Sequence, residues 1–153
     1  MNILVKSAIA GFIATVPMTI FMTYVFKKLP HEEKYPLPPR KITLNVAEKA
    51  GIKPKLDESQ KMALTMFGHF SFGAAAGSLF FPLMKFLSIP KYLGGIGYGL
   101  LVWSTSYLGW LPLVKLHQSA TKMPMGRNAL MIGAHIVWGG VLSFLYSYKR
   151  RTL

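Results

Sequence analysis

Residues 62–84 of the chain read MALTMFGHFSFGAAAGSLFFPLM, a stretch without a charged side chain whose one ionisable residue is His69. An α-helix rises about 1.5 Å per residue, so a run of this length crosses the ~30 Å hydrocarbon core of a bilayer. Three more charge-free runs of similar length lie at residues 7–26, 92–114 and 128–148. A chain of 153 residues has too little interior to bury four such helices, so the runs indicate a membrane protein.

The composition supports the same interpretation. Hydrophobic residues make up 52% and charged residues 15% of the sequence, whereas an ordinary soluble domain carries about a quarter charged residues. We therefore expect a single integral membrane domain over residues 1–153, an all-α membrane protein folded as a four-transmembrane-helix bundle. The first run ends at Lys27 and Lys28 without a small-residue cleavage site, so it predicts an uncleaved span rather than a signal peptide.

The polar loop at residues 27–61 contains all five acidic residues of the chain. Its first part is rich in proline and should be extended, because proline fixes φ and lacks a donor. Residues 40–50 place apolar side chains at helical spacing, which predicts a short amphipathic interfacial helix between the first and second spans. Asp57 and Gln60 have the spacing of a capping box, so we expect the second helix to begin near Glu58.

The 18 basic residues of the chain would suggest nucleic acid in a soluble protein. Here they lie at the ends of the apolar runs. We therefore expect the lipid bilayer and anionic lipid headgroups as partners, and we expect no binding of nucleic acid. Arg40, Lys41 and Arg127 are the candidate headgroup contacts. Residues 27–61 and 115–127 together hold 12 basic residues against 6 on the opposite side of the membrane, which favours a cytoplasmic position for these two loops.

Small and hydroxyl-bearing residues recur at helical spacing along the predicted spans. Such rows mark faces where helices approach closely in a membrane. They are Ser7, Gly11, Thr15, Thr19 and Thr23; Thr65, His69, Gly73 and Gly77; Gly95, Gly99 and Ser106; and Asn128, His135, Gly139 and Ser143. The rows predict one packing face on each helix, and they also suit a homo-oligomer or a membrane partner subunit.

Two histidines lie inside the spans at matching positions. His69 and His135 each follow the start of their run by 7 residues, so on helices that run in the same direction both lie about 10 Å below one membrane surface. Each also precedes a glycine by 4 residues, which gives a faint twofold repeat of the kind found in transporters. Intramembrane ionisable residues are candidates for function. The candidate intramembrane polar site comprises His69, His135, Thr15, Thr19, Thr65 and Asn128.

Three interpretations of these histidines stay open: hydrogen bonding between helices, handling of protons or substrate, and ligation of haem or a divalent metal ion. For a metal, the candidate ligands are His69, His135 and His117. The sequence has no cysteine and no carboxylate within a span, so this set is short of ligands and we expect no cofactor. The chain also lacks a phosphate-binding glycine loop, a GxSxG motif and an HExxH motif, so we predict no catalytic residue.

Three short segments of the chain are similar to a known protein family: residues 36–40 (PLPPR), 68–69 (GH) and 134–138 (AHIVW). In these segments the chain resembles the YagU-like family of small, largely uncharacterised bacterial inner-membrane proteins. The resemblance covers only the proline-rich loop and two helices. It implies a multi-pass protein of the bacterial inner membrane, directs attention to Arg40, and implies no reaction.

Three functions are compatible with these features. The first is a small non-enzymatic membrane protein, either a homo-oligomer or an accessory subunit. The second is a small transporter or channel that uses a polar face with His69 and His135. The third is a membrane protein in which histidines ligate a metal or haem.

Overall fold

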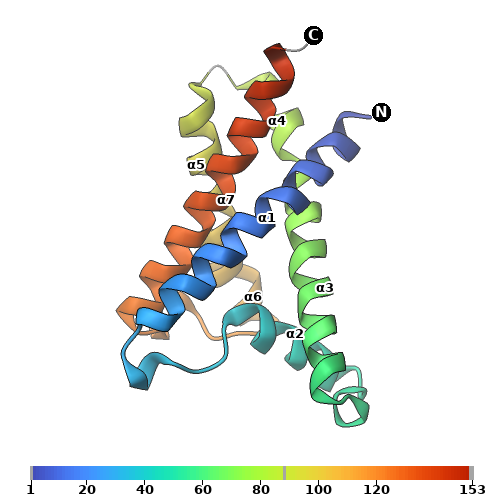
Figure 1. The fold of residues 1–153 in the computed structure, drawn as a ribbon, viewed down its shortest axis with the longest axis vertical. Coiled ribbons are helices and arrows are strands. Elements are labelled where there is room, and N and C mark those ends of the chain that lie inside the picture. The colour runs from blue at the N-terminus through green and yellow to red at the C-terminus, as the bar shows by residue number, and fades with distance from the viewer. Residues whose placement is uncertain (1, 88, 152–153) are drawn as a thin grey trace.

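The computed structural model describes residues 2–87 and 89–151 of the chain, with side chains up to residue 147. These residues fold into helices without any strand (Figure 1). The main helices are α1 (Ile3–Lys28), α3 (Glu58–Gly77), α5 (Lys91–Ser104) and α7 (Met125–Arg151). Shorter helices are α2 (Pro38–Lys49), α4 (Phe80–Phe86) and α6 (Leu111–Leu113). The expected all-α fold is confirmed.

Three helical stretches are long and apolar enough to cross a membrane: Ile3–Lys28, Glu58–Phe86 and Met125–Ser147. The remaining apolar run, residues 92–114, is not one regular helix. It consists of α5, the π-helix η3 (Thr105–Trp110) and α6, joined end to end. Gly109 lies at the kink with φ −107° and ψ −107°. The structure thus confirms three membrane-spanning candidates and shows a bent helical path for the fourth run.

The second run is also interrupted, between α3 and α4. Pro82 lacks a backbone N–H and its ring clashes with the carbonyl one turn earlier, so the helix breaks before it. Ser7 of α1 repairs the break: its hydroxyl donates to the carbonyl of Gly77 over 2.6 Å and accepts from the N–H of Phe81 over 2.9 Å. At the other end of α3, Asp57 and Gln60 form the predicted capping box.

The helices pack in two pairs through glycines, as the rows of small residues predict. In the first pair, a Cβ on Gly11 of α1 would overlap the backbones of Gly73 and Gly77 on α3. In the second, a Cβ on Gly139 of α7 would overlap the backbones of Gly95 and Gly99 on α5. Each pair therefore has its backbones in direct contact, and α1 also packs against α7.

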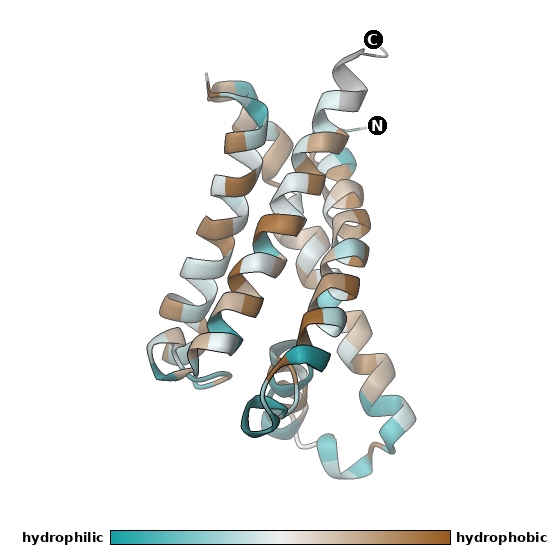
Figure 2. Cartoon of the chain, turned by 60° about the vertical axis from the view of Figure 1, so that its left-hand side comes forward, coloured by the Kyte–Doolittle hydropathy of each residue, from teal (hydrophilic) through white to brown (hydrophobic). Residues whose placement is uncertain are grey.

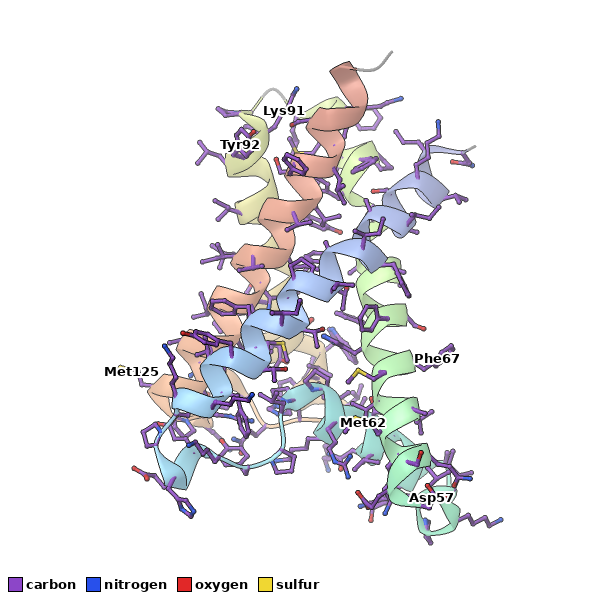
Figure 3. The ribbon with its side chains drawn as sticks, viewed as in Figure 1. Asp57, Met62, Phe67, Lys91, Tyr92 and Met125 are labelled. Atoms are coloured by element: carbon purple, nitrogen blue, oxygen red, sulfur yellow. The ribbon has the colours of Figure 1, made fainter. Side chains whose placement is uncertain are left out.

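The two ends of the bundle differ in what they carry. Asp57 at the start of α3 and Met125 at the start of α7 lie at one end, whereas Lys91 and Tyr92 at the start of α5 lie at the other (Figure 3). Helices α3 and α7 thus run in the same direction, as expected. The N- and C-termini share the end near Lys91, and the long loop with α2 lies at the opposite end (Figure 1).

Hydrophobic residues predominate along the middle of the helices, and hydrophilic residues are concentrated towards their ends (Figure 2). Phe67, which is 71% exposed, points away from the bundle in the middle of α3 (Figure 3). Ile20 on α1 and Leu101 on α5 are likewise exposed. Large apolar side chains exposed on several long helices agree with a membrane location.

Candidate ligand-binding cavity

A cavity of about 470 Å³ lies between α2, α3, η3 and α7. Its wall is mainly apolar, and the amphipathic helix α2 contributes one side of it through Ile42, Val46 and Ala47. The polar lining residues are few: Thr15, Thr43, His69, Ser106, Tyr107 and His135. A concave apolar site with a few convergent polar groups is the usual form of a site for a small apolar ligand.

The structure brings His69 and His135 together at this cavity, and each ring has one nitrogen engaged. The hydroxyl of Thr19 donates to the carbonyl of Thr15 over 2.7 Å, so it accepts from Nε2 of His69 over 3.2 Å. His135 donates from Nδ1 to the carbonyl of Met131 over 2.8 Å, because a carbonyl can only accept. Nδ1 of His69 and Nε2 of His135 are left as hydrogen-bond acceptors.

Tyr107 separates the cavity from the loop that follows α6. Its ring meets the ring of His135 edge-on at 6.0 Å and the ring of His117 edge-on at 5.5 Å. His117 is buried and donates from Nδ1 to the carbonyl of Gln118 over 2.8 Å. Burial is the largest cause and lowers the pKa of His117; the hydrogen bond to the carbonyl of Gln118 raises it, and the nearby charges of Lys41 and Arg127 lower it. His117 therefore lies outside the cavity, behind Tyr107.

The predicted threonines and asparagine separate into two groups. The hydroxyl of Thr15 lines the cavity and donates to the carbonyl of Gly11 over 2.8 Å, and Thr19 reaches the cavity through His69. Thr65 donates to its own helix at Lys61, and Asn128 donates to the carbonyl of Ala120 over 2.7 Å. Neither of the last two lines the cavity.

Residues 1–152 match the model of a family of unknown function, DUF6789. The chain belongs to the DUF6789 family. No curated protein and no solved structure matches this DUF6789 chain. The resemblance to YagU-like proteins is not confirmed by the family match. Family membership therefore names no reaction, ligand or partner, and the cavity is the feature of this chain that points to a function.

The three basic candidates of the DUF6789 chain have different surroundings. Arg40 forms an ion pair with Glu58 at 2.6 Å, which ties α2 to the start of α3. Lys41 is half-buried and lines a second, smaller pocket beside the cavity. Arg127 is only 1% exposed. Its guanidinium donates to the carbonyls of Tyr35 and Pro36, each over 2.9 Å, and lies over the Tyr35 ring. Arg127 thus holds the loop after α1 in place, and a contact with a lipid headgroup stays a prediction for it as for Arg40 and Lys41.

Sequence reasoning did not find the polar wall supplied by the π-helix. Ser106 and Tyr107 of η3 lie in the cavity wall, together with Trp110. π-Helices are rare and frequently mark functional sites, because the extra residue per turn redirects side chains. The only signal in the sequence is a group of hydroxyl residues before Gly109, which by itself suggests no more than a packing face.

Haem or metal ligation finds limited support in this geometry. Within the described residues, no three His, Cys, Asp or Glu side chains converge. His69 and His135 share the cavity, but the third candidate, His117, lies behind Tyr107. A metal ion bound here would have two protein ligands, fewer than the three that open metal sites ordinarily provide.

Proposed function

We propose that this DUF6789 protein is a four-span, multi-pass protein of the bacterial inner membrane that binds an apolar molecule in the cavity and is not an enzyme. The succession of α5, η3 and α6 would form the fourth span, because residues 92–114 carry no charge. The observation that supports the binding function is the cavity itself. It is about 470 Å³ in volume, it is walled by apolar side chains, and only a few polar groups line it.

The wall indicates the chemistry of the ligand. Apolar surface buried on binding contributes roughly 25 cal/mol per Å², so a hydrocarbon chain or ring suits the lining made by α2 and α3. His69 and His135 each present one acceptor nitrogen, and Ser106 and Tyr107 carry hydroxyls. Unpaired polar groups in an apolar site are costly, so the ligand should also carry a hydroxyl or carbonyl group that pairs with them.

Mass spectrometry of the purified protein tests this proposal. The protein would be isolated in a mild detergent, and its co-purified small molecules extracted and identified. We expect an apolar compound in near-stoichiometric amount. Val46→Trp should displace it by filling the cavity, because Val46 lines the cavity and is 48% exposed. Val5→Trp is the matched control, since Val5 is equally exposed at 48% on α1 but lies outside the cavity. Equal loads in both variants would refute the proposal.

A second candidate function is transport through the same space. Two observations favour it: His69 and His135 share the cavity, and each precedes by one turn the glycine at which its helix crosses its partner. Reconstituted liposomes would be assayed for proton flux and for flux of the extracted compound. Unchanged flux in the His69→Ala, His135→Ala double variant would exclude a pathway through these residues. An absorption spectrum and elemental analysis of the same sample would test haem or metal ligation.

An oligomeric or accessory role is compatible with ligand binding. The exposed apolar faces of α1 and α5 contact lipid in a monomer and would contact another membrane subunit in an assembly. The mass of the protein in nanodiscs, measured by light scattering, distinguishes the two arrangements.

A further inference from the structure

A second pocket of about 360 Å³ lies beside the cavity, at the end of the bundle opposite the termini. Three lysines line it: Lys41 from α2, and Lys115 and Lys122 from the loop between α6 and α7. None of the five acidic residues of the chain lines this pocket. The pocket is therefore strongly basic.

The positive charge of the pocket is not neutralised by the protein. The ion pairs found among the described residues join Arg40 and Lys61 to Glu58 and Lys53 to Glu48, and they leave out all three pocket lysines. None of the three ammonium groups has a protein hydrogen-bond acceptor in the described part of the chain. Each is available to an anion from outside.

Nearby carbonyls that would repel an anion are already occupied. Lys49 donates to the carbonyl of Val114 over 2.7 Å, and Asn45 donates to the carbonyl of Leu116 over 2.8 Å. His117 covers the carbonyl of Gln118. These bonds also fix α2 against the loop, so the positions of the lysines relative to one another are set by the fold.

The backbone conformation of Lys115 is a second indication that a lysine is needed in this pocket. Its φ is +57°, and it is the one non-glycine residue with a positive φ among the described residues. A left-handed residue after a helix is usually glycine, since a side chain there costs about 1–2 kcal/mol. The end of α6 therefore carries a lysine where glycine would be less strained, and this lysine lines the pocket.

The basic pocket and the apolar cavity adjoin each other. Leu116 lines both of them. Tyr107 lies in the cavity wall and contacts the ring of His117, which lines the basic pocket. The basic pocket also lies at a hydrophilic end of the bundle (Figure 2), and in a membrane-spanning bundle such an end would face the lipid headgroups. One amphiphilic molecule could thus place an anionic group among the lysines and its chain in the cavity.

We propose that Lys41, Lys115 and Lys122 bind the phosphate of an anionic lipid whose hydrocarbon chain enters the adjoining cavity. The inference rests on the proposed binding function and adds the class of ligand. Lysines bind phosphate as point charges, and basic side chains near a membrane surface favour anionic lipids. The occupant is a lipid with a net negative headgroup rather than a net-neutral one, because a net-neutral headgroup would leave the positive charge of the three lysines uncompensated.

Native mass spectrometry of the detergent-solubilised full chain tests the assignment. The probes are phosphatidic acid, phosphatidylcholine and inorganic phosphate. Phosphatidic acid should bind the wild type about tenfold or more tightly than phosphatidylcholine. The variant Lys41→Gln, Lys115→Gln, Lys122→Gln should lose this preference. The control Lys6→Gln, Lys85→Gln, Lys91→Gln, with the same loss of charge at the other end of the bundle, should retain it.

The outcomes separate this inference from the proposed function. If the lysine variant keeps its preference for phosphatidic acid while Val46→Trp still displaces lipid, the headgroup site is refuted and the cavity function stands. If Val46→Trp displaces no lipid, the cavity function fails. Inorganic phosphate that binds as tightly as phosphatidic acid would replace the lipid with a free anion and overturn the proposal. Lys115→Gly is the control for misfolding. This variant should raise or preserve the thermal stability of the protein and still weaken the binding of phosphatidic acid.

Discussion

The indole N–H of Trp138 on α7 donates to the carbonyl oxygen of Gly11 on α1 over 3.1 Å. The same carbonyl accepts the hydroxyl of Thr15 over 2.8 Å. Gly11 is also the residue at which the backbone of α1 contacts that of α3, so this bond connects α7 to the crossing of α1 and α3. Trp138 and Thr15 both line the cavity, and the connection therefore sets the shape of its inner end.

Trp138→Phe removes this donor and should destabilise the protein by about 1–3 kcal/mol, through the lost hydrogen bond and the smaller ring. Trp103→Phe is the matched control. The N–H of Trp103 is buried and has no hydrogen-bond partner among the described residues, so Trp103→Phe removes an unpaired polar group. Unfolding in mixed micelles, followed by far-ultraviolet circular dichroism, gives the free energy of unfolding of both variants. Equal destabilisation of the two variants would contradict the assigned role of the bond.

Neighbouring glycines on α7 should respond in opposite ways to alanine. A Cβ at Gly139 would overlap the backbone of Gly95 on α5, whereas a Cβ at Gly140 meets no atom within 4 Å. Gly139→Ala should therefore cost about 1–3 kcal/mol by overpacking. Gly140→Ala should stabilise by up to about 1 kcal/mol, because alanine is the better helix former. Thermal denaturation in one detergent compares the two. A neutral Gly139→Ala would exclude backbone contact at this crossing.

These glycine crossings are the part of the fold that the sequence predicts best. Close contact between membrane helices needs small residues at regular spacing, and that spacing is visible from residues such as Gly73 and Gly139 alone. The alternating direction of the predicted spans also places His69 and His135 on parallel helices, and both line one cavity in the structure. Their equal depth in the membrane stays a prediction.

The cavity is less predictable because it depends on tertiary contacts. The amphipathic pattern of residues 40–50 correctly predicts a helix, but where its apolar face points depends on how Arg127 anchors the preceding loop. The π-helix before Gly109 redirects Ser106 and Tyr107, and nothing in the hydropathy of residues 92–114 marks it. The uninterrupted apolar run at residues 62–84 did not predict the break between α3 and α4, and the repair of this break by Ser7 comes from another helix.

Arg127 should be intolerant even of lysine. Its guanidinium donates to loop carbonyls at Glu33, Tyr35 and Pro36 at once, a geometry that a single ammonium group cannot reproduce. Arg127→Lys should cost about 1–3 kcal/mol through the buried carbonyls left unpaired, and it should loosen the loop. Limited proteolysis after Lys34 and chemical unfolding report the two effects. Arg40→Lys, in a partly exposed ion pair, should cost less than about 1 kcal/mol.

His117 should make the stability of the protein fall in mild acid. Burial is the main cause that lowers its pKa in the folded state, and the charges of Lys41 and Arg127 act in the same direction. The unfolded chain, with an ordinary histidine pKa of about 6.5, therefore binds the proton more tightly than the folded chain does. The stabilisation is fully present above that value and decreases as the pH falls below it towards the lowered folded pKa.

The test compares the free energy of unfolding at pH 8 and pH 5 in wild type and variants. His117→Gln should reduce the pH dependence, because the neutral amide cannot be protonated in this range. His31→Gln should leave it unchanged, since the side chain of His31 is exposed and makes no hydrogen bond among the described residues. An unaltered profile in His117→Gln would assign the acid sensitivity to other groups.

The same titration with phosphatidic acid present extends the test to the basic pocket. Protonated His117 adds a fourth positive charge beside Lys41, Lys115 and Lys122, so bound lipid should offset part of the loss of stability at pH 5.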